Sequence, residues 1–245
     1  MCKNFIQHRF LDFPGAYKER PMDFNNIAHK YDSWFLTPLG SYVDRHEKEI
    51  TWRLAKPRAG EKVLDIGTGT ANYLLELARM GLDCTGLEVS RKMISRALEK
   101  SESQGLNLKL VQAVSEAIPF RPNHFDLVIS VTAFEFFSSP EKAISEMTTV
   151  CKPGGRIVIG ILNKWSLWAI RRRIITWFKE TIFTHCRFYS YREMKRLTGA
   201  TYWGTAVFAP PWLPKFMLPV FEFLEPYLQK AAKPFGAYLV VCKKL

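Results

Sequence analysis

One stretch of this 245-residue chain restricts its fold more than any other: an apolar run ends at two closely spaced glycines, and a helical pattern follows. Residues 62–66 are rich in β-prone side chains and predict a strand. Residues 72–80 have the apolar spacing of a helix, which stops at Gly81. Gly67 and Gly69 predict a tight turn between them, because glycine adopts backbone angles that other residues avoid.

Apolar runs and helical patterns alternate along the rest of the chain. Strands are expected at residues 62–66, 83–88, 108–112, 125–130 and 156–162, with two further strands near 202–208 and 237–242. A helix is expected after each of the first two strands. The alternation predicts an α/β fold, with a mostly parallel, doubly wound sheet that is covered by helices on both faces.

Capping patterns predict two later helices. Ser139 followed by Pro140 is typical of a helix start and predicts a helix that runs to Val150. Ser190 with Glu193 matches a capping box for a helix that runs to Leu197. The prolines between residues 210 and 234 exclude one long helix in that segment but allow short ones.

The turn and the next strand carry groups that suit a nucleoside. Glu88 lies at the end of the second expected strand, nineteen residues after Gly69. A carboxylate at that position accepts hydrogen bonds from ribose hydroxyls. The helix after the turn has unpaired N–H groups at its N-terminus, which can bind the ligand. These features predict a nucleoside site.

The residues around the turn also indicate which nucleoside is bound. A dinucleotide fingerprint has a third glycine where this chain has Asn72, and the chain contains no Gly-Lys-Ser/Thr phosphate loop. The Asp65 carboxylate would repel a pyrophosphate but would attract a ligand with a sulfonium or ammonium centre. The pattern therefore favours S-adenosylmethionine over NAD.

Five motifs occur in order over about residues 24–162. They are Asp65-x-Gly67-x-Gly69, Glu88 with Ser90 and Met93, Glu116-Ala117-Ile118-Pro119-Phe120, Phe125-Asp126-Leu127-Val128-Ile129, and Lys152-Pro153-Gly154-Gly155. In this order the chain resembles the class I S-adenosylmethionine-dependent methyltransferases, a broad group that includes quinone-biosynthesis and other small-molecule enzymes. The resemblance implies a Rossmann-like, seven-stranded sheet whose last two strands form an antiparallel hairpin.

The resemblance also implies a set of cofactor-binding residues. They are Tyr31, Asp65, Gly67, Thr68, Gly69, Glu88, Val89, Met93, Ser115, Glu116 and Ser130. Asp65 and the two glycines would hold the methionine part of S-adenosylmethionine, Glu88 the ribose, and Val89 and Met93 the adenine. Residues 24–35 resemble the helix that precedes the core in this family. The tyrosine at the Tyr31 position of that helix would reach the cofactor carboxylate, with ordinary helix packing as the alternative. The product would be S-adenosylhomocysteine.

One position departs from the family pattern. Related chains often have an aspartate that accepts a hydrogen bond from the adenine amino group, whereas this chain has Val114 before Ser115 and Glu116. Valine cannot accept that hydrogen bond, so Ser115, a backbone carbonyl or water must replace it. If none of them accepts the hydrogen bond, the binding free energy of the cofactor weakens by about 1 to 2 kcal/mol.

The reaction that the resemblance implies needs few catalytic groups. Methyl transfer is an in-line displacement, so alignment supplies most of the acceleration, and a base is needed only when the acceptor loses a proton. Glu135 follows the strand expected at 125–130, near the expected position of the methyl group. It is the candidate base or acceptor-binding group, with a surface or capping carboxylate as the alternative.

Basic and aromatic residues are concentrated in the last third of the chain. Residues 163–245 contain 14 Lys and Arg but only 4 Asp and Glu, and they hold 18 of the 34 aromatic residues. We therefore divide the chain into an N-terminal helical lid (1–55), a cofactor-binding core (56–162) and a basic, aromatic part (163–245). In the family, the first and last of these parts cover the acceptor pocket.

A pocket covered by basic and aromatic residues predicts a small hydrophobic or amphipathic acceptor, which can carry an acidic group. Nucleic acid is not favoured, because the aromatic residues are mixed with aliphatic ones as in a core. Two alternatives stay open: a methyltransferase that acts on protein or RNA, and a non-catalytic protein that binds S-adenosylmethionine or a membrane surface.

The segment from Ser166 to Lys179 predicts an amphipathic helix. Such a helix suits an anionic membrane surface, and the alternative is that its apolar face packs on the domain. The sequence has no uninterrupted apolar run of eighteen residues and no signal-peptide pattern. The five widely spaced cysteines, Cys2 among them, suggest unpaired thiols and no metal site. We expect a cytoplasmic protein, with peripheral membrane contact through this helix.

Overall fold

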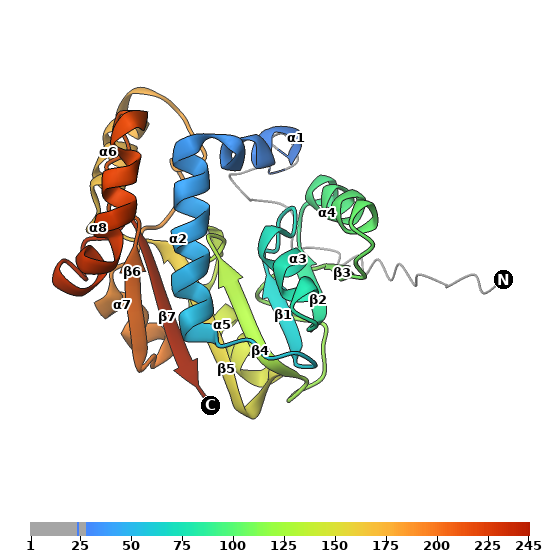
Figure 1. Cartoon of the computed structure of the whole chain (residues 1–245). Coiled ribbons are helices and arrows are strands. Elements are labelled where there is room, and N and C mark those ends of the chain that lie inside the picture. The colour runs from blue at the N-terminus through green and yellow to red at the C-terminus, as the bar shows by residue number, and fades with distance from the viewer. Residues whose placement is uncertain (1–23, 25–27) are drawn as a thin grey trace.

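The apolar runs form one seven-stranded sheet in the computed structural model, which describes Phe24 and residues 28–245. The strands are β1 (Lys62–Ile66), β2 (Asp83–Glu88), β3 (Lys109–Gln112), β4 (Phe125–Val131), β5 (Cys151–Leu162), β6 (Tyr202–Ala206) and β7 (Tyr238–Lys244). Their order across the sheet is β3-β2-β1-β4-β5-β7-β6 (Figure 1). The first five strands are parallel, and β7 is antiparallel to both β5 and β6. The predicted fold class is confirmed.

The helices lie on both faces of the sheet (Figure 1). They are α1 (Ala28–Tyr31), α2 (Pro38–Ala55), α3 (Asn72–Arg79), α4 (Arg91–Ser103), α5 (Pro140–Val150), α6 (Leu167–Phe178), α7 (Tyr191–Thr198) and α8 (Leu218–Ala231), with the short 3-10 helices η2 (Asp32–Leu36), η3 (Phe134–Phe136) and η4 (Lys215–Met217). The predicted proline start of α5 and the capping box of α7 are both present. No helix in the described part of the chain has the length and apolar content needed to cross a bilayer.

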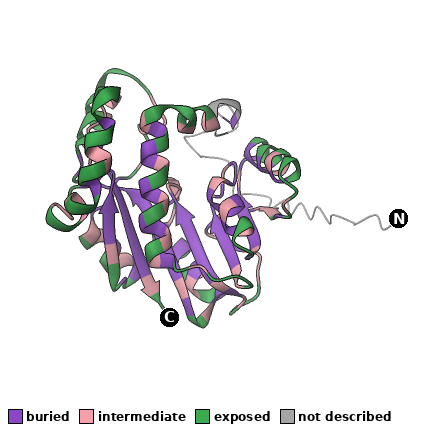
Figure 2. Ribbon diagram, viewed as in Figure 1, coloured by how far each residue is buried: buried purple, intermediate pink, exposed green. Residues whose placement is uncertain are grey.

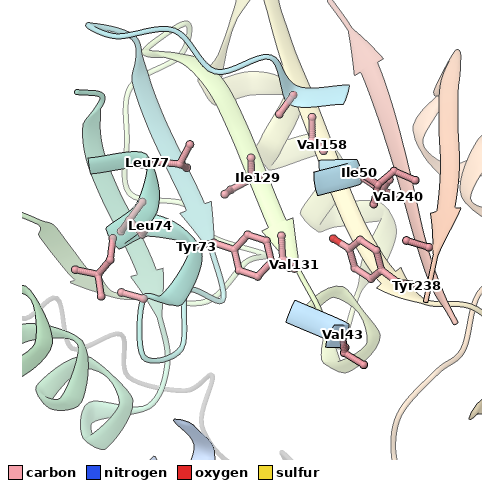
Figure 3. Close-up of a cluster of buried hydrophobic side chains, with 14 of the residues drawn as sticks. Val43, Ile50, Tyr73, Leu74, Leu77, Ile129, Val131, Val158, Tyr238 and Val240 are labelled. Carbon is pink, nitrogen blue, oxygen red and sulfur yellow. The ribbon is translucent and has the colours of Figure 1, made fainter. Parts of the chain in front are cut away.

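Residues on the central strands alternate between two cores, because successive side chains of a strand point to opposite faces. On β4, Ile129 joins the core under α2 and α3, whereas Val128 joins the core under α5 and α7. Figure 3 shows the first of these cores, with Leu74 of α3 on one side, Val43 and Ile50 of α2 on the other, and Ile129 of β4 between them. The strands are buried on both faces, and the helices are exposed on their outer sides (Figure 2).

The expected N-terminal helical part consists of α1, η2 and the long helix α2, which packs across β5, β6 and β7. Residues 1–23 and 25–27, which include Cys2 and part of the expected helix at 24–35, lie outside the described residues. The described segment from Asp32 to Leu36 is a 3-10 helix rather than an α-helix.

Two elements differ from their predicted limits by more than two residues. β5 begins at Cys151 rather than at residue 156, because Cys151 pairs with Phe125 before a bulge brings Arg156 opposite Leu127. α8 extends through Pro226, although the prolines predicted only short helices. A proline inside a helix removes a single backbone hydrogen bond, and tertiary contacts hold α8.

The buried Glu225 carboxylate supplies the contacts that hold α8. It accepts a hydrogen bond from the Tyr42 hydroxyl, and its oxygens lie 2.6 Å from the backbone nitrogen of Val207 and 3.1 Å from that of Phe208. These bonds join α8 to α2 and to the segment after β6. The helix therefore forms where the local sequence alone disfavours it.

Candidate active site

A cavity lies at the carboxyl ends of β1 and β4, where the strand order reverses. Ligands of open α/β sheets bind at such a switch point, and we call this space the switch-point cavity. The segments after β1, β2 and β4 line it together with the N-terminal segment. Nine of the eleven predicted cofactor-binding residues are among the lining residues: Tyr31, Asp65, Gly67, Thr68, Gly69, Glu88, Val89, Met93 and Ser115.

The turn after β1 requires its glycines for different reasons. Gly67 has a φ of 73° and Gly69 a φ of 55°, in the left-handed region that disfavours other residues. A Cβ atom on Gly67 would lie 2.4 Å from the Cβ of Ala133, whereas one on Gly69 would meet no heavy atom within 4 Å. Gly67 thus allows two loops to touch, and Gly69 leaves open space beside the cavity.

Asp65 gives the cavity a buried acid. Its Oδ2 accepts a hydrogen bond from the Thr68 hydroxyl at 2.7 Å. Burial raises the pKa of the Asp65 carboxyl to about 7, Glu88 adds to the rise, and the bond from Thr68 opposes it. Two acids close together in a partly dry site favour a positively charged ligand over an anion.

Glu88 ties the turn after β1 to the end of β2. Its Oε2 accepts a hydrogen bond from the backbone N–H of Gly69 at 3.0 Å, and its Oε1 accepts bonds from Val89 and Ser90 at 2.8 and 2.9 Å. The same residue that holds the turn also lines the switch-point cavity, where an acid at the end of the second strand binds ribose hydroxyls in related folds.

Glu116 and Ser130 do not line the switch-point cavity. Glu116 accepts hydrogen bonds from the backbone N–H of Ser138 at 2.9 Å and from the Ser115 hydroxyl at 2.9 Å. The Ser130 hydroxyl donates to the carbonyl of Ile66 at 2.9 Å. Both side chains connect segments behind the cavity, while Ser115 lies on the cavity wall.

The structure does not bring Glu135, the candidate base, to a cavity wall. Its side chain is 2% exposed, and one carboxylate oxygen accepts a hydrogen bond from the backbone N–H of Leu162. Burial raises the pKa of Glu135 to about 7. The chain turns into η3 directly after β4, so this carboxylate connects η3 to β5.

The N-terminal segment covers the switch-point cavity and is held by a polar cluster. Asp32 Oδ1 accepts hydrogen bonds from Thr70 at 2.7 Å, Asn72 at 3.2 Å and Lys100 at 3.1 Å. The preceding Tyr31 lines the cavity. Burial, with a contribution from nearby carboxylates, raises the pKa of Tyr31 to about 12. The lid is therefore docked on α3 and α4.

A larger cavity of about 670 Å³ adjoins the first, and we call it the apolar cavity. Its walls come from the lid, α2, α6 and the segment that follows α6. Most of its lining side chains are apolar. It shares six lining residues with the switch-point cavity, namely Phe24, Tyr31, Phe35, Glu47, Thr132 and Phe136. The two cavities therefore meet at a common wall.

Glu47 of α2 is the one carboxylate among the described residues that lines both cavities. Its side chain is 8% exposed, and its Oε2 lies 3.5 Å from the Tyr73 hydroxyl. Burial raises the pKa of Glu47 to about 8, Asp44 adds to the rise, and Arg172 opposes it. Sequence reasoning missed Glu47, although its place on the apolar face of a helix was a usable signal.

Comparisons with known proteins agree with this geometry. Residues 64–159 match a family model described as a methyltransferase domain. The chain is 33% identical over 143 residues to demethylmenaquinone methyltransferase of Thermus thermophilus. These aligned residues cover 56% of this chain and 62% of that protein. It is 30% identical over 168 residues to the ubiquinone/menaquinone biosynthesis C-methyltransferase UbiE of Wigglesworthia glossinidia brevipalpis. These aligned residues cover 63% of this chain and 66% of the relative. Each match spans less than two thirds of the relative.

The fold also has solved counterparts. One is the crystal structure of a possible histamine N-methyltransferase, described as S-adenosylmethionine-dependent, from Thermotoga maritima. The two structures align with a TM-score of 0.68 at 20% identity, over 90% of this chain and 97% of the other. The matched domain, the strand order and the glycine turn agree with the predicted resemblance to the class I S-adenosylmethionine-dependent methyltransferases.

Proposed function

We propose that this protein transfers the methyl group of S-adenosylmethionine to a small apolar or amphipathic acceptor. One observation carries the proposal: the cavity lined by the predicted cofactor residues shares a wall with an apolar cavity large enough for a second ligand. The cofactor would lie in the switch-point cavity, with its ribose at Glu88 and its sulfonium near the buried acids. The acceptor would lie in the apolar cavity.

The shared wall is where the reaction would take place. A nucleophilic atom of the acceptor attacks the methyl carbon, the carbon–sulfur bond breaks, and its electron pair returns to sulfur as S-adenosylhomocysteine forms. Holding the three atoms in line supplies most of the acceleration. Glu47 lies at this wall, so its carboxylate would take the proton that the acceptor loses. In this proposal Glu47 replaces Glu135 as the general base.

The relatives and the lining both support an apolar acceptor. The names of the two curated relatives refer to demethylmenaquinone and to ubiquinone/menaquinone biosynthesis, and quinones of this kind are hydrophobic. Apolar walls suit such a ring because burying apolar surface is favourable by roughly 25 cal/mol per Å². We therefore propose an aromatic or quinone-like acceptor rather than a protein or RNA.

Sorting methylated products by chemical class tests this proposal. The protein is incubated with S-adenosylmethionine labelled in the methyl group and with separate lipid, protein and RNA fractions of a cell lysate. We expect label in the lipid or small-molecule fraction, because the acceptor must fit inside an apolar cavity. Protein that has been heat-inactivated serves as the control. Label found only in protein or RNA would refute the small-molecule acceptor.

We also propose that α6 contacts an anionic membrane surface, from which such an acceptor could enter. The helix lines the apolar cavity on one side, and only Trp168 and Ala169 of its residues are buried. At its end, Trp177 is 79% exposed and Phe178 is 84% exposed. Arg171 and Arg173 are exposed on the same helix. Basic residues beside exposed aromatic ones suit an interface with anionic lipid.

Vesicle co-sedimentation tests the membrane contact. We expect binding to vesicles that contain phosphatidylglycerol and much weaker binding to pure phosphatidylcholine. Changing Arg171 and Arg173 to Glu should weaken binding at least tenfold, because each basic residue near the surface contributes about 1 kcal/mol. The matched control changes Lys195 and Arg196 of α7 to Glu, two exposed positions on another helix. Equal effects of the two double variants would rule out a contact through α6.

A further inference from the structure

One arginine of α6 lies within the wall of the apolar cavity. Arg172 lines this cavity, and its Nη1 is buried and has no hydrogen-bond partner. Its Cζ lies 5.1 Å from the centroid of the Trp168 ring and 4.5 Å from that of Phe183. Cation–π contacts of this kind hold a guanidinium by its face. The N–H donors at its edge stay available to a ligand.

The charge of Arg172 is not cancelled by a carboxylate. Among the described residues, none forms an ion pair with it within 4.0 Å. Glu47 and Glu135 are near enough to favour its charged form, while burial lowers the pKa of Arg172 to about 10. Burial also raises the pKa of Glu47 to about 8 and that of Glu135 to about 7. The guanidinium therefore keeps its charge near neutral pH, beside two carboxyls whose burial disfavours their ionised forms.

A buried charge without a partner is costly to the folded protein, and a bound anion removes that cost. The neighbouring residues point to the kind of anion. A planar guanidinium matches a carboxylate with two parallel hydrogen bonds. The remaining wall is apolar, apart from Tyr31, Glu47, two threonines and Arg171, which is exposed. A multiply charged phosphate would find no second buried cation among these lining residues.

We propose that Arg172 binds a carboxylate on an otherwise apolar acceptor. This inference rests on the proposed function, because it assigns the acceptor class to the same apolar cavity. Arg172 thereby becomes the residue that selects acidic amphiphiles over neutral ones. Of its neighbours in the Arg-Arg-Arg run, Arg171 is exposed where it meets the cavity, and Arg173 is exposed and does not line the cavity.

Three ten-carbon probes with different head groups test the assignment by calorimetry. Decanoate, decanol and decylammonium are titrated into the full chain with S-adenosylhomocysteine present. Wild-type protein should bind decanoate at least tenfold more tightly than decanol, and it should bind decylammonium most weakly. In Arg172→Gln the preference for decanoate over decanol should disappear, while decanol affinity changes by less than about twofold.

The matched control is Arg173→Gln, which removes the same charge from the next position of the helix. Arg173 does not line the cavity and packs its guanidinium on the Phe188 ring at 5.6 Å. This variant should keep the preference for decanoate. A preference that survives in Arg172→Gln, or that is lost equally in Arg173→Gln, would overturn the assignment.

Wild-type protein alone can also decide the question if Arg172→Gln does not fold. Equal affinity for decanoate and decanol in the wild type would overturn the carboxylate site. A titration with S-adenosylhomocysteine on the same samples separates the two proposals. Absence of cofactor-product binding counts against the methyltransferase function, whereas normal product binding without a charge preference counts only against the role of Arg172.

Discussion

Replacing Glu47 with glutamine is expected to slow methyl transfer by about 10²-fold or more, the usual contribution of a positioned general base. Glutamine has nearly the same shape and can still accept a hydrogen bond from Tyr73, but it cannot take a proton. Product binding and thermal stability should therefore stay close to the wild type. Initial rates of label transfer to the acceptor, together with calorimetry of S-adenosylhomocysteine, measure the two effects separately.

The pH dependence of the reaction gives a second test of Glu47. The base must be ionised, and the pKa of Glu47 is about 8 because the side chain is buried. Activity should therefore rise with pH and level off at or below pH 8, since a bound sulfonium favours the ionised carboxylate. This limb should be absent in Glu47→Gln. In Arg172→Gln it should move to higher pH, because Arg172 lowers the pKa of Glu47.

Glu49→Gln is the matched control, because it makes the same change two positions along α2. The Glu49 side chain is 56% exposed and pairs with His46, and it lines neither cavity. Its rate and pH profile should match those of the wild type. An unchanged rate and an unchanged pH profile in Glu47→Gln would exclude Glu47 as the base.

Replacing Gly67 with alanine is expected to weaken binding of S-adenosylhomocysteine by more than tenfold and to lower thermal stability. The new Cβ would lie 2.4 Å from the Cβ of Ala133, so one of the two loops that line the switch-point cavity must move. The left-handed backbone adds strain of roughly 1 to 2 kcal/mol. Calorimetry measures the affinity, and thermal unfolding measures the stability.

Two other glycines separate the causes of this loss. Gly105 has a φ of 63° and, like Gly69, has no heavy atom within 4 Å of a built Cβ, but it lies outside both cavities. Gly105→Ala should cost stability through backbone strain alone and leave binding unchanged. Gly69→Ala should cost similar stability but weaken binding, because its new methyl group enters the cavity. Wild-type affinity in Gly67→Ala would disprove a cofactor site at this turn.

The cofactor half of the site was predictable because short contiguous segments carry it. Gly67 follows β1, and Glu88 ends β2. The carboxyl ends of parallel strands meet at one edge of the sheet, so residues at those ends must come together. The same rule suggested Glu135 after β4, but the 3-10 turn that follows that strand directs its carboxylate to the backbone of Leu162 instead.

The apolar cavity could not be predicted in this way, because helices supply its charged groups. Helical spacing places Glu47 on the apolar face of α2, but the space that its carboxylate faces depends on how that helix crosses β5, β6 and β7. Local periodicity shows that a helix has an apolar face, but not which neighbour that face meets. α8 is a similar case, since its extension through Pro226 depends on Glu225 and its partners in α2 and after β6.

The sequence by itself determined the α/β fold and the glycine turn with its acids, because backbone preferences and strand periodicity act over a few residues. Only the tertiary structure decided the strand order and which charged side chains line the apolar cavity. Three consecutive arginines of α6 are alike in sequence, yet packing half-buries Arg172 against Trp168 and Phe183 and leaves Arg171 and Arg173 exposed. Burial removes water from a charge, and that loss depends on segments distant in the chain.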